Sequence, residues 1–230
     1  LIDAQLPPYN QLSPGDTIFL QAGLWDNLEI QNFKGNVGKP YVFVNKGGVV
    51  KFSTDHNHGI SIQNCQFFRL TGIGFKSEFY GIQIDKVENG TGIGVGKLSS
   101  DFEIDHISIK NVPIAGIYAK TDPDCSGKTT REFFTQFNTN IHDNYIENAG
   151  NEGLYIGSSK YFGQTVRCGD KDTLLIPSVL KGVKVYNNII RNSGWDGIQV
   201  SSATKDCSIY GNKIYNDSQA EVPSQMSGII

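Results

Sequence analysis

The chain has 230 residues, of which 38% are hydrophobic and 19% charged, so its composition is that of a folded protein rather than a disordered one. A formal net charge of −3 and a pI near 5.8 argue against nucleic-acid binding, and no run of about 18 apolar residues exists that could insert into a membrane. The abundance of glycine, with 26 residues, together with many asparagines and isoleucines, favours an all-β fold.

A short phrase recurs along the chain from residue 59 onward: glycine, an aliphatic residue, any residue, and another apolar residue. It occurs as GISI (59–62), GIQI (81–84), GIYA (116–119), GLYI (153–156) and GIQV (197–200), and GII (228–230) begins it again. The glycines are 22, 35, 37, 44 and 31 residues apart. A shortest unit with variable additions is typical of a solenoid with loop insertions.

A second phrase precedes these glycines and aligns without gaps. It reads FRLTGIGFKS (68–77), FEIDHISIKN (102–111), TNIHDNYIEN (139–148), VKVYNNIIRN (183–192) and CSIYGNKIYN (207–216). Asparagine gathers at its sixth position as Asn144, Asn188 and Asn212, and at its tenth as Asn111, Asn148, Asn192 and Asn216. The sixth position is predicted to be a tight turn with a left-handed backbone, which asparagine tolerates. Coils stacked about 4.8 Å apart would let each column form an asparagine ladder.

These paired phrases, as in VKVYNNIIRNSGWDGIQV (183–200), resemble the coils of right-handed parallel β-helix proteins, the architecture of pectate lyases and many secreted polysaccharide-active enzymes. PGDTIFLQAG (14–23) and GKPYVFVNKGGVVKF (38–52) resemble the first coils of such proteins. The resemblance concerns the fold, and no motif of a particular enzyme family is matched. It implies an all-β, right-handed parallel β-helix solenoid.

The predicted solenoid is one domain over residues 1–230, with N-terminal coils at about 15–58 and regular coils at 59–230. Its last phrase stops at Ile230, just inside a strand. An uncapped coil exposes an open sheet edge. A further domain or chain is therefore expected to cover this end.

Strand alternation predicts that the third and fifth residues of each Gly-Ile strand point outward. Insertions are expected after these strands at 86–101, 121–138, 157–182 and 202–206, with an excursion at 217–227. Such loops would wall a groove whose polar, tyrosine-bearing floor suits a carbohydrate. The expected substrate-binding residues are Gln83, Asp85, Tyr118, Lys120, Tyr155 and Gln199. An ordinary solvated β-face is the alternative.

Catalysis along this groove would need a base with a cation for a lyase, or two carboxylates for a hydrolase. The 157–182 insertion offers Lys160 and Arg167, while Glu152 and Asp196 precede their strands at equivalent positions in adjacent coils. Adjacent coils would place these two carboxylates about 5 Å apart. Acidic residues are also routine at turns, which is the structural alternative for this pair.

Cys125 and Cys168 lie in insertions on adjacent coils and are predicted to form a disulfide, which implies an exported protein. Cys207 falls in an inward column and is predicted to be buried. Acidic clusters flank the predicted disulfide and offer a calcium site, with solvated loops as the alternative. The candidate ligands are Asp122, Asp124, Asp170 and Asp172.

The sequence thus predicts a bacterial-type protein, secreted or on the cell surface, that engages a polysaccharide or other glycan along a groove. Two functions stay open: a polysaccharide lyase or glycoside hydrolase, and a non-catalytic adhesin, stalk or carbohydrate-binding module. A lyase requires a base and a cation site that converge over Tyr118 and Tyr155.

Overall fold

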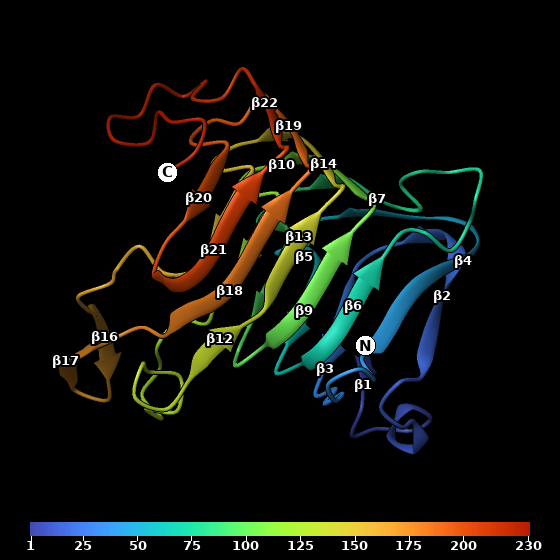
Figure 1. The fold of residues 1–230 in the computed structure, drawn as a ribbon, viewed down its shortest axis with the longest axis horizontal. Coiled ribbons are helices and arrows are strands. Elements are labelled where there is room, and N and C mark those ends of the chain that lie inside the picture. The colour runs from blue at the N-terminus through green and yellow to red at the C-terminus, as the bar shows by residue number, and fades with distance from the viewer.

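The computed structural model describes residues 1–230, and its regular secondary structure is almost entirely β-strand (Figure 1). Its one helix is a short 3-10 turn, η1 (Tyr9–Gln11), so no helix has the length and apolar character needed to cross a membrane. The strands form two large sheets, which we name sheet A and sheet B, and one small hairpin. The prediction of an all-β fold is confirmed.

Sheet A has seven strands, and every neighbouring pair is parallel. In spatial order they are β1 (Ile2–Asp3), β3 (Leu28–Gln31), β5 (His58–Gln63), β8 (Thr91–Gly96), β11 (Ile117–Ala119), β15 (Leu154–Ile156) and β20 (Ile198–Val200).

Sheet B has thirteen strands and is also parallel throughout. Its strands are β2 (Thr17–Trp25), β4 (Tyr41–Thr54), β6 (Gln66–Thr71), β7 (Ile82–Val87), β9 (Ser100–Asp105), β10 (Ile107–Val112), β12 (Thr135–Phe137), β13 (Thr139–His142), β14 (Tyr145–Ala149), β18 (Val179–Tyr186), β19 (Ile189–Arg191), β21 (Ala203–Tyr210) and β22 (Lys213–Tyr215). The hairpin consists of β16 (Gln164–Cys168) and β17 (Lys171–Leu175), which are antiparallel.

The chain visits the sheets in a repeating order of two sheet B strands followed by one sheet A strand. The sets β6–β7–β8, β9–β10–β11, β13–β14–β15 and β18–β19–β20 follow this order. Each strand pairs with its counterpart in the next set, so β9, β13, β18 and β21 lie side by side in chain order (Figure 1). Sequence repeats separated by 24 to 44 residues thereby become adjacent strands.

One strand that was predicted for sheet A lies in sheet B. GIQI (81–84) belongs to β7, which pairs with β4 and β10 in sheet B. Its predicted place in sheet A is taken by GIGV (92–95) of β8, so residues 86–101 are not a loop insertion. Residues 202–206 are likewise mostly part of β21. Alternation of apolar residues marks a buried strand face in either sheet, so the pattern alone could not separate the two.

The glycine that opens each sheet A phrase lies where chain segments approach closely. A Cβ atom on Gly116 would lie 2.6 Å from the carbonyl oxygen of Gly153 and 2.6 Å from Cγ2 of Ile146. Gly92, Gly153 and Gly197 meet the same kind of contact. The glycine column therefore reflects packing of adjacent repeats.

The two predicted asparagine columns are hydrogen-bonded where asparagine is present, from β10 toward the C-terminus. In the sixth-position column, Asn144 Nδ2 donates to Asn188 Oδ1 at 3.1 Å, and Asn188 Nδ2 donates to Asn212 Oδ1 at 3.0 Å. In the tenth-position column the corresponding donors are Asn148, Asn192 and Asn216. Earlier repeats carry other residues there, so the predicted ladders are confirmed only in part.

The left-handed residue of the turn is the fifth position of the phrase, which corrects the prediction for the sixth. Asp143 and Asn187 have φ values of 53° and 55°. Asn144 and Asn188, at the sixth position, are fully buried instead. Their amides bond to backbone groups of adjacent repeats, because buried backbone N–H and C=O groups need partners.

A continuous core of 37 buried residues lies inside the sheets, with Phe33, Phe43 and Phe52 among its largest side chains. Cys207 continues an inward column after Val183 in register, as predicted, but it is exposed. It lies on β21, which pairs with β18 alone and is covered by no further strand. At the C-terminus, Ile229 forms a parallel bridge with Ile198, in the register expected for GII (228–230).

Candidate functional site

The outward column of sheet A is the predicted floor of the groove. In spatial order it contains Glu29, Ser61, Gly94, Tyr118, Tyr155 and Gln199. Gln83 and Asp85 are not part of it, because β7 lies in sheet B, where Gln83 pairs with Lys51 and Ser108. Their predicted place in this groove is therefore wrong.

The two tyrosines of the column stack on each other, but they do not form an open platform. The Tyr118 and Tyr155 ring centroids are 5.0 Å apart with an interplanar angle of 23°. Tyr155 is only 9% exposed, and its hydroxyl is 2.9 Å from Ser159 Oγ. Gln199 is also buried and donates to Ser201. The loop that follows β15 thus occupies the part of the column where a sugar was expected to stack.

Lys120 lies over both rings, with Nζ 5.0 Å from each centroid and 2.8 Å from Asp122 Oδ1. Burial alone would lower the pKa of Lys120, but Asp122 and Tyr118 raise it above its ordinary value. Burial also raises the pKa of Tyr118, an effect that Lys120 reduces. Both groups therefore hold their protons at neutral pH, which is unfavourable for a general base.

The open part of the sheet A face lies beside Tyr118, over β3, β5 and β8. Three adjoining hollows of about 280, 330 and 340 Å³ are found there, and all three are lined by Gln63. We call them together the sheet A groove. Amide and hydroxyl side chains line much of it, among them Asn27, Gln31, Ser61, Gln63, Asn64 and Thr129. Six lining side chains are charged: Glu29, Lys97, Lys120, Asp122, Asp124 and Lys128.

One wall of the groove is the segment after β11, where Asp124 and Thr129 line two of the hollows. The predicted disulfide between Cys125 and Cys168 is confirmed, and it ties this segment to the β16–β17 hairpin. The same segment is also hydrogen-bonded to the chain on either side of the hairpin, since the Arg131 N–H donates to the Ile176 carbonyl at 3.0 Å and Arg131 Nη2 donates to the Tyr161 carbonyl at 2.6 Å.

The predicted basic residues of the hairpin region do not face the groove. Arg167 pairs with Asp172 across the β16–β17 hairpin at 3.3 Å, and both side chains are well exposed. Lys160 is exposed in the preceding loop, and neither it nor Arg167 lines the groove. The structure therefore does not bring these groups to the predicted substrate.

Glu152 and Asp196 occupy equivalent positions on adjacent repeats, as predicted, but both are buried, with exposures of 4% and 0%. Burial raises the pKa of Glu152, and the nearby Asp196 adds to the rise. Burial also raises the pKa of Asp196, partly offset by the Ser227 N–H, which donates to Oδ1 at 2.8 Å. Neither carboxyl group lines the groove, so neither can contact a polymer bound there.

The aspartates predicted to bind calcium are not gathered into one site. Asp122 pairs with Lys120, Asp124 accepts the Ser126 N–H at 2.9 Å, and Asp172 pairs with Arg167. Two groups of three potential metal ligands do occur: Asp26–Asp55–His56 and Glu103–Asp105–His142. Neither includes Asp122, Asp124, Asp170 or Asp172.

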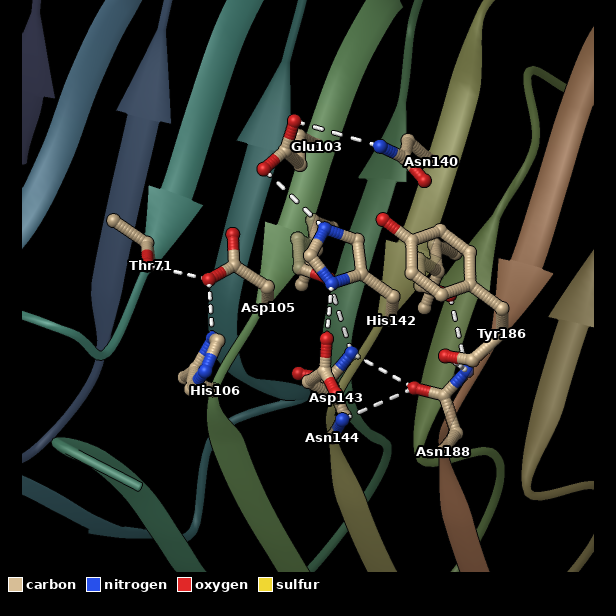
Figure 2. Close-up of polar contacts among 12 residues, drawn as sticks. Thr71, Glu103, Asp105, His106, Asn140, His142, Asp143, Asn144, Tyr186 and Asn188 are labelled. Atoms are coloured by element: carbon tan, nitrogen blue, oxygen red, sulfur yellow. Dashed lines mark hydrogen bonds and ion pairs between the residues drawn. The ribbon is translucent and has the colours of Figure 1, made fainter. Parts of the chain in front are cut away.

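A charged network on the outward face of sheet B was missed by the sequence reasoning. Arg69 Nε lies 2.9 Å from Glu103 Oε1 and 2.8 Å from Asp105 Oδ2, so one guanidinium pairs with two carboxylates. Figure 2 shows Asp105 between Thr71 and His106. Burial would raise the pKa of Asp105, but hydrogen bonds from Arg69, Thr71 and His106 lower it overall.

His142 completes this network between Glu103 and Asp143, at 3.3 and 2.7 Å (Figure 2). Its ring stacks on Tyr186 with centroids 4.4 Å apart. Arg69 already occupies both carboxylates, so the Glu103–Asp105–His142 group is better satisfied by internal ion pairs than by a metal. Reading the outward positions of the aligned phrases FEIDH and TNIH together would have revealed the network.

Comparison with protein-family models, with curated proteins and with solved structures gives no match.

Proposed function

We propose that the chain is an exported, right-handed parallel β-helix solenoid that binds a polysaccharide along the sheet A groove without cleaving it. The repeating strand order, the parallel pairing of successive repeats and the hydrogen-bonded asparagines support the solenoid. Crossover connections between parallel strands are almost always right-handed, which supports the hand. The Cys125–Cys168 disulfide favours an oxidising compartment and therefore export, to the medium or the cell surface.

The observation that carries the binding proposal is the continuity of the groove through Gln63, which lines all three hollows. The hollows follow one another across strands of a parallel sheet, which suits an extended polymer better than a compact ligand. Neutral amides and hydroxyls offer donors and acceptors that match the hydroxyl groups of a sugar chain. A glycan is therefore the ligand class that fits this surface.

Binding is favoured over lyase or hydrolase chemistry because none of the predicted catalytic residues, which are Glu152, Asp196, Lys160 and Arg167, lines the groove. Lys120 is neutralised by Asp122 within the site, and the carboxyls of Glu152 and Asp196 are buried away from it. A lyase needs a base beside a bound cation, and a hydrolase needs two accessible carboxyl groups. An adhesin or carbohydrate-binding module requires neither.

The test is a binding screen of the wild-type chain against immobilised neutral and anionic polysaccharides. For the polymer that binds, Gln63→Ala is expected to weaken affinity about tenfold, or about 1.4 kcal/mol, because Gln63 is common to all three hollows. Gln83→Ala is the matched control, since Gln83 lies on sheet B and should leave affinity unchanged.

The same samples are assayed for reducing ends and for the absorbance of unsaturated products. Release of either from the bound polymer would refute non-catalytic binding and favour the enzyme alternative. Equal affinities for wild type and Gln63→Ala would remove the groove from the binding site.

A further inference from the structure

A fourth hollow, of about 480 Å³, lies on the outward face of sheet B, away from the sheet A groove. We call it the sheet B hollow. Arg69, Glu103 and Asn140 line it from adjacent strands of one outward column, and residues 36–40 supply an edge. Phe67 lines it as well. The hollow therefore combines an aromatic side chain with groups that form directional hydrogen bonds.

The backbone of Phe67 is in the left-handed region, with φ of 49°. The corresponding positions of the next repeats are Asp101, Asn138 and Gly182, which also have positive φ. Glycine, asparagine and aspartate accept this conformation readily, whereas a bulky residue there costs about 1–2 kcal/mol. Phe67 is thus the one residue type in this column that destabilises its own turn, and strain of this kind often marks a functional position.

The polar side chains that line the hollow are not fully hydrogen-bonded within the protein. Asn140 Nδ2 makes a long, 3.4 Å hydrogen bond with Glu103 Oε2 (Figure 2), and the same amide also interacts with the Tyr186 hydroxyl. Asn140 Nδ2, whose bond to Glu103 is long, can instead donate to a hydroxyl group of a ligand in the hollow.

We propose that the sheet B hollow is a second carbohydrate site, which takes a single neutral pyranose residue. The apolar face of the sugar packs against Phe67, and its hydroxyls bond to Asn140 and Glu103. Two lining carboxylates, Asp101 and Glu103, face only one lining cation, Arg69, so an acidic sugar is disfavoured. This site goes beyond the proposed groove and does not depend on it.

The test is titration of the full chain with the methyl pyranosides of glucose, galactose, mannose and N-acetylglucosamine, followed by protein NMR. At least one is expected to bind and to shift signals of Phe67 and its neighbours. Phe67→Asn is expected to weaken that binding at least tenfold while the melting temperature stays equal or rises, because asparagine suits the left-handed turn. A purely structural Phe67 would instead lose melting temperature and leave binding intact.

Asn140→Ala provides a second variant that does not rely on the strained turn. It should weaken binding about tenfold with little change in melting temperature, since its amide is poorly paired in the free protein. Ser208→Ala is the matched control, on the same outward column but outside the hollow. Gln63→Ala should also bind the glycoside normally, which separates this site from the sheet A groove.

Three outcomes would overturn the proposal. They are no binding of any of the four glycosides at millimolar concentration, binding that survives both Phe67→Asn and Asn140→Ala, and binding that Gln63→Ala abolishes.

Discussion

At the residue scale, charged side chains on the outward face of sheet B form ion pairs with one another. Glu103 and Asp105 are two residues apart on β9, so they point the same way and would repel each other without Arg69. His142, from the next repeat, adds a second cationic partner when protonated. The stability of this face should therefore depend on the protonation of His142.

His142→Phe is expected to lose the ion pairs but keep an aromatic ring against Tyr186. Burial would lower the pKa of His142, yet Glu103 and Asp143 raise it above its unfolded-state value of 6.5. Stabilisation by protonated His142 is thus fully present below about pH 6.5 and is lost as pH rises through the folded-state pKa. Urea unfolding should show the variant less stable by about 1–2 kcal/mol near pH 6, with a smaller gap near pH 9. A gap that is the same at both pH values would contradict this assignment.

At the element scale, the glycine before each sheet A strand sets how closely successive repeats can stack. At each of these glycines, the backbone of the next repeat lies so close that a Cβ atom would collide with it, as the contact between Gly116 and Gly153 shows. Gly228 occupies the same column at the last repeat, but nothing lies within 4 Å of its Cβ position. The two positions therefore form a matched pair for testing the packing.

Gly116→Ala is expected to reduce the free energy of unfolding by about 1–3 kcal/mol, because the added methyl group must displace the Gly153 carbonyl or Ile146. Gly228→Ala should change it by less than about 0.5 kcal/mol. Chemical denaturation of both variants measures the difference. Equal losses in the free energy of unfolding would mean that the destabilisation comes from the different backbone preferences of glycine and alanine and not from contact between repeats.

At the scale of the whole molecule, parallel sheets hold the chain together, while the segments after β11 and β15 are joined to each other by one disulfide and by the hydrogen bonds of Arg131. The disulfide joins residues 43 positions apart, and both of its cysteines lie outside sheets A and B. The sheets share one buried core, whereas the β16–β17 hairpin pairs only with itself. Loss of the disulfide should therefore increase the mobility of these segments without unfolding the sheets.

Cys125→Ser combined with Cys168→Ser is expected to speed amide hydrogen exchange in residues 121–134 and 158–178, while β11 and β15 keep their protection. Affinity for the polysaccharide should fall as well, since Asp124 and Thr129 line the groove. Cys207→Ser, at an exposed free cysteine, is the control. Faster exchange throughout both sheets would show that the disulfide stabilises the whole fold instead.

The amino-acid sequence by itself determined the strand content, the repeat, the hydrogen-bonded asparagines and the Cys125–Cys168 pair. Each of these follows from spacing along the chain, because equivalent positions of successive repeats become neighbours. Alternation also predicted correctly that Tyr118 and Tyr155 share one outward column.

Only the tertiary structure decided to which sheet each repeated strand belongs and which outward side chains remain accessible to a ligand. Alternation distinguishes the two faces of a strand, but it does not say that GIQI (81–84) joins sheet B or that a loop covers Tyr155. The aligned phrases place Arg69 and Glu103 in one outward column, but the diagonal contact of His142 with Glu103 was decided by the structure. The groove beside Tyr118 and the hollow beside Phe67 exist because of how loops close over these faces, which no local pattern specifies.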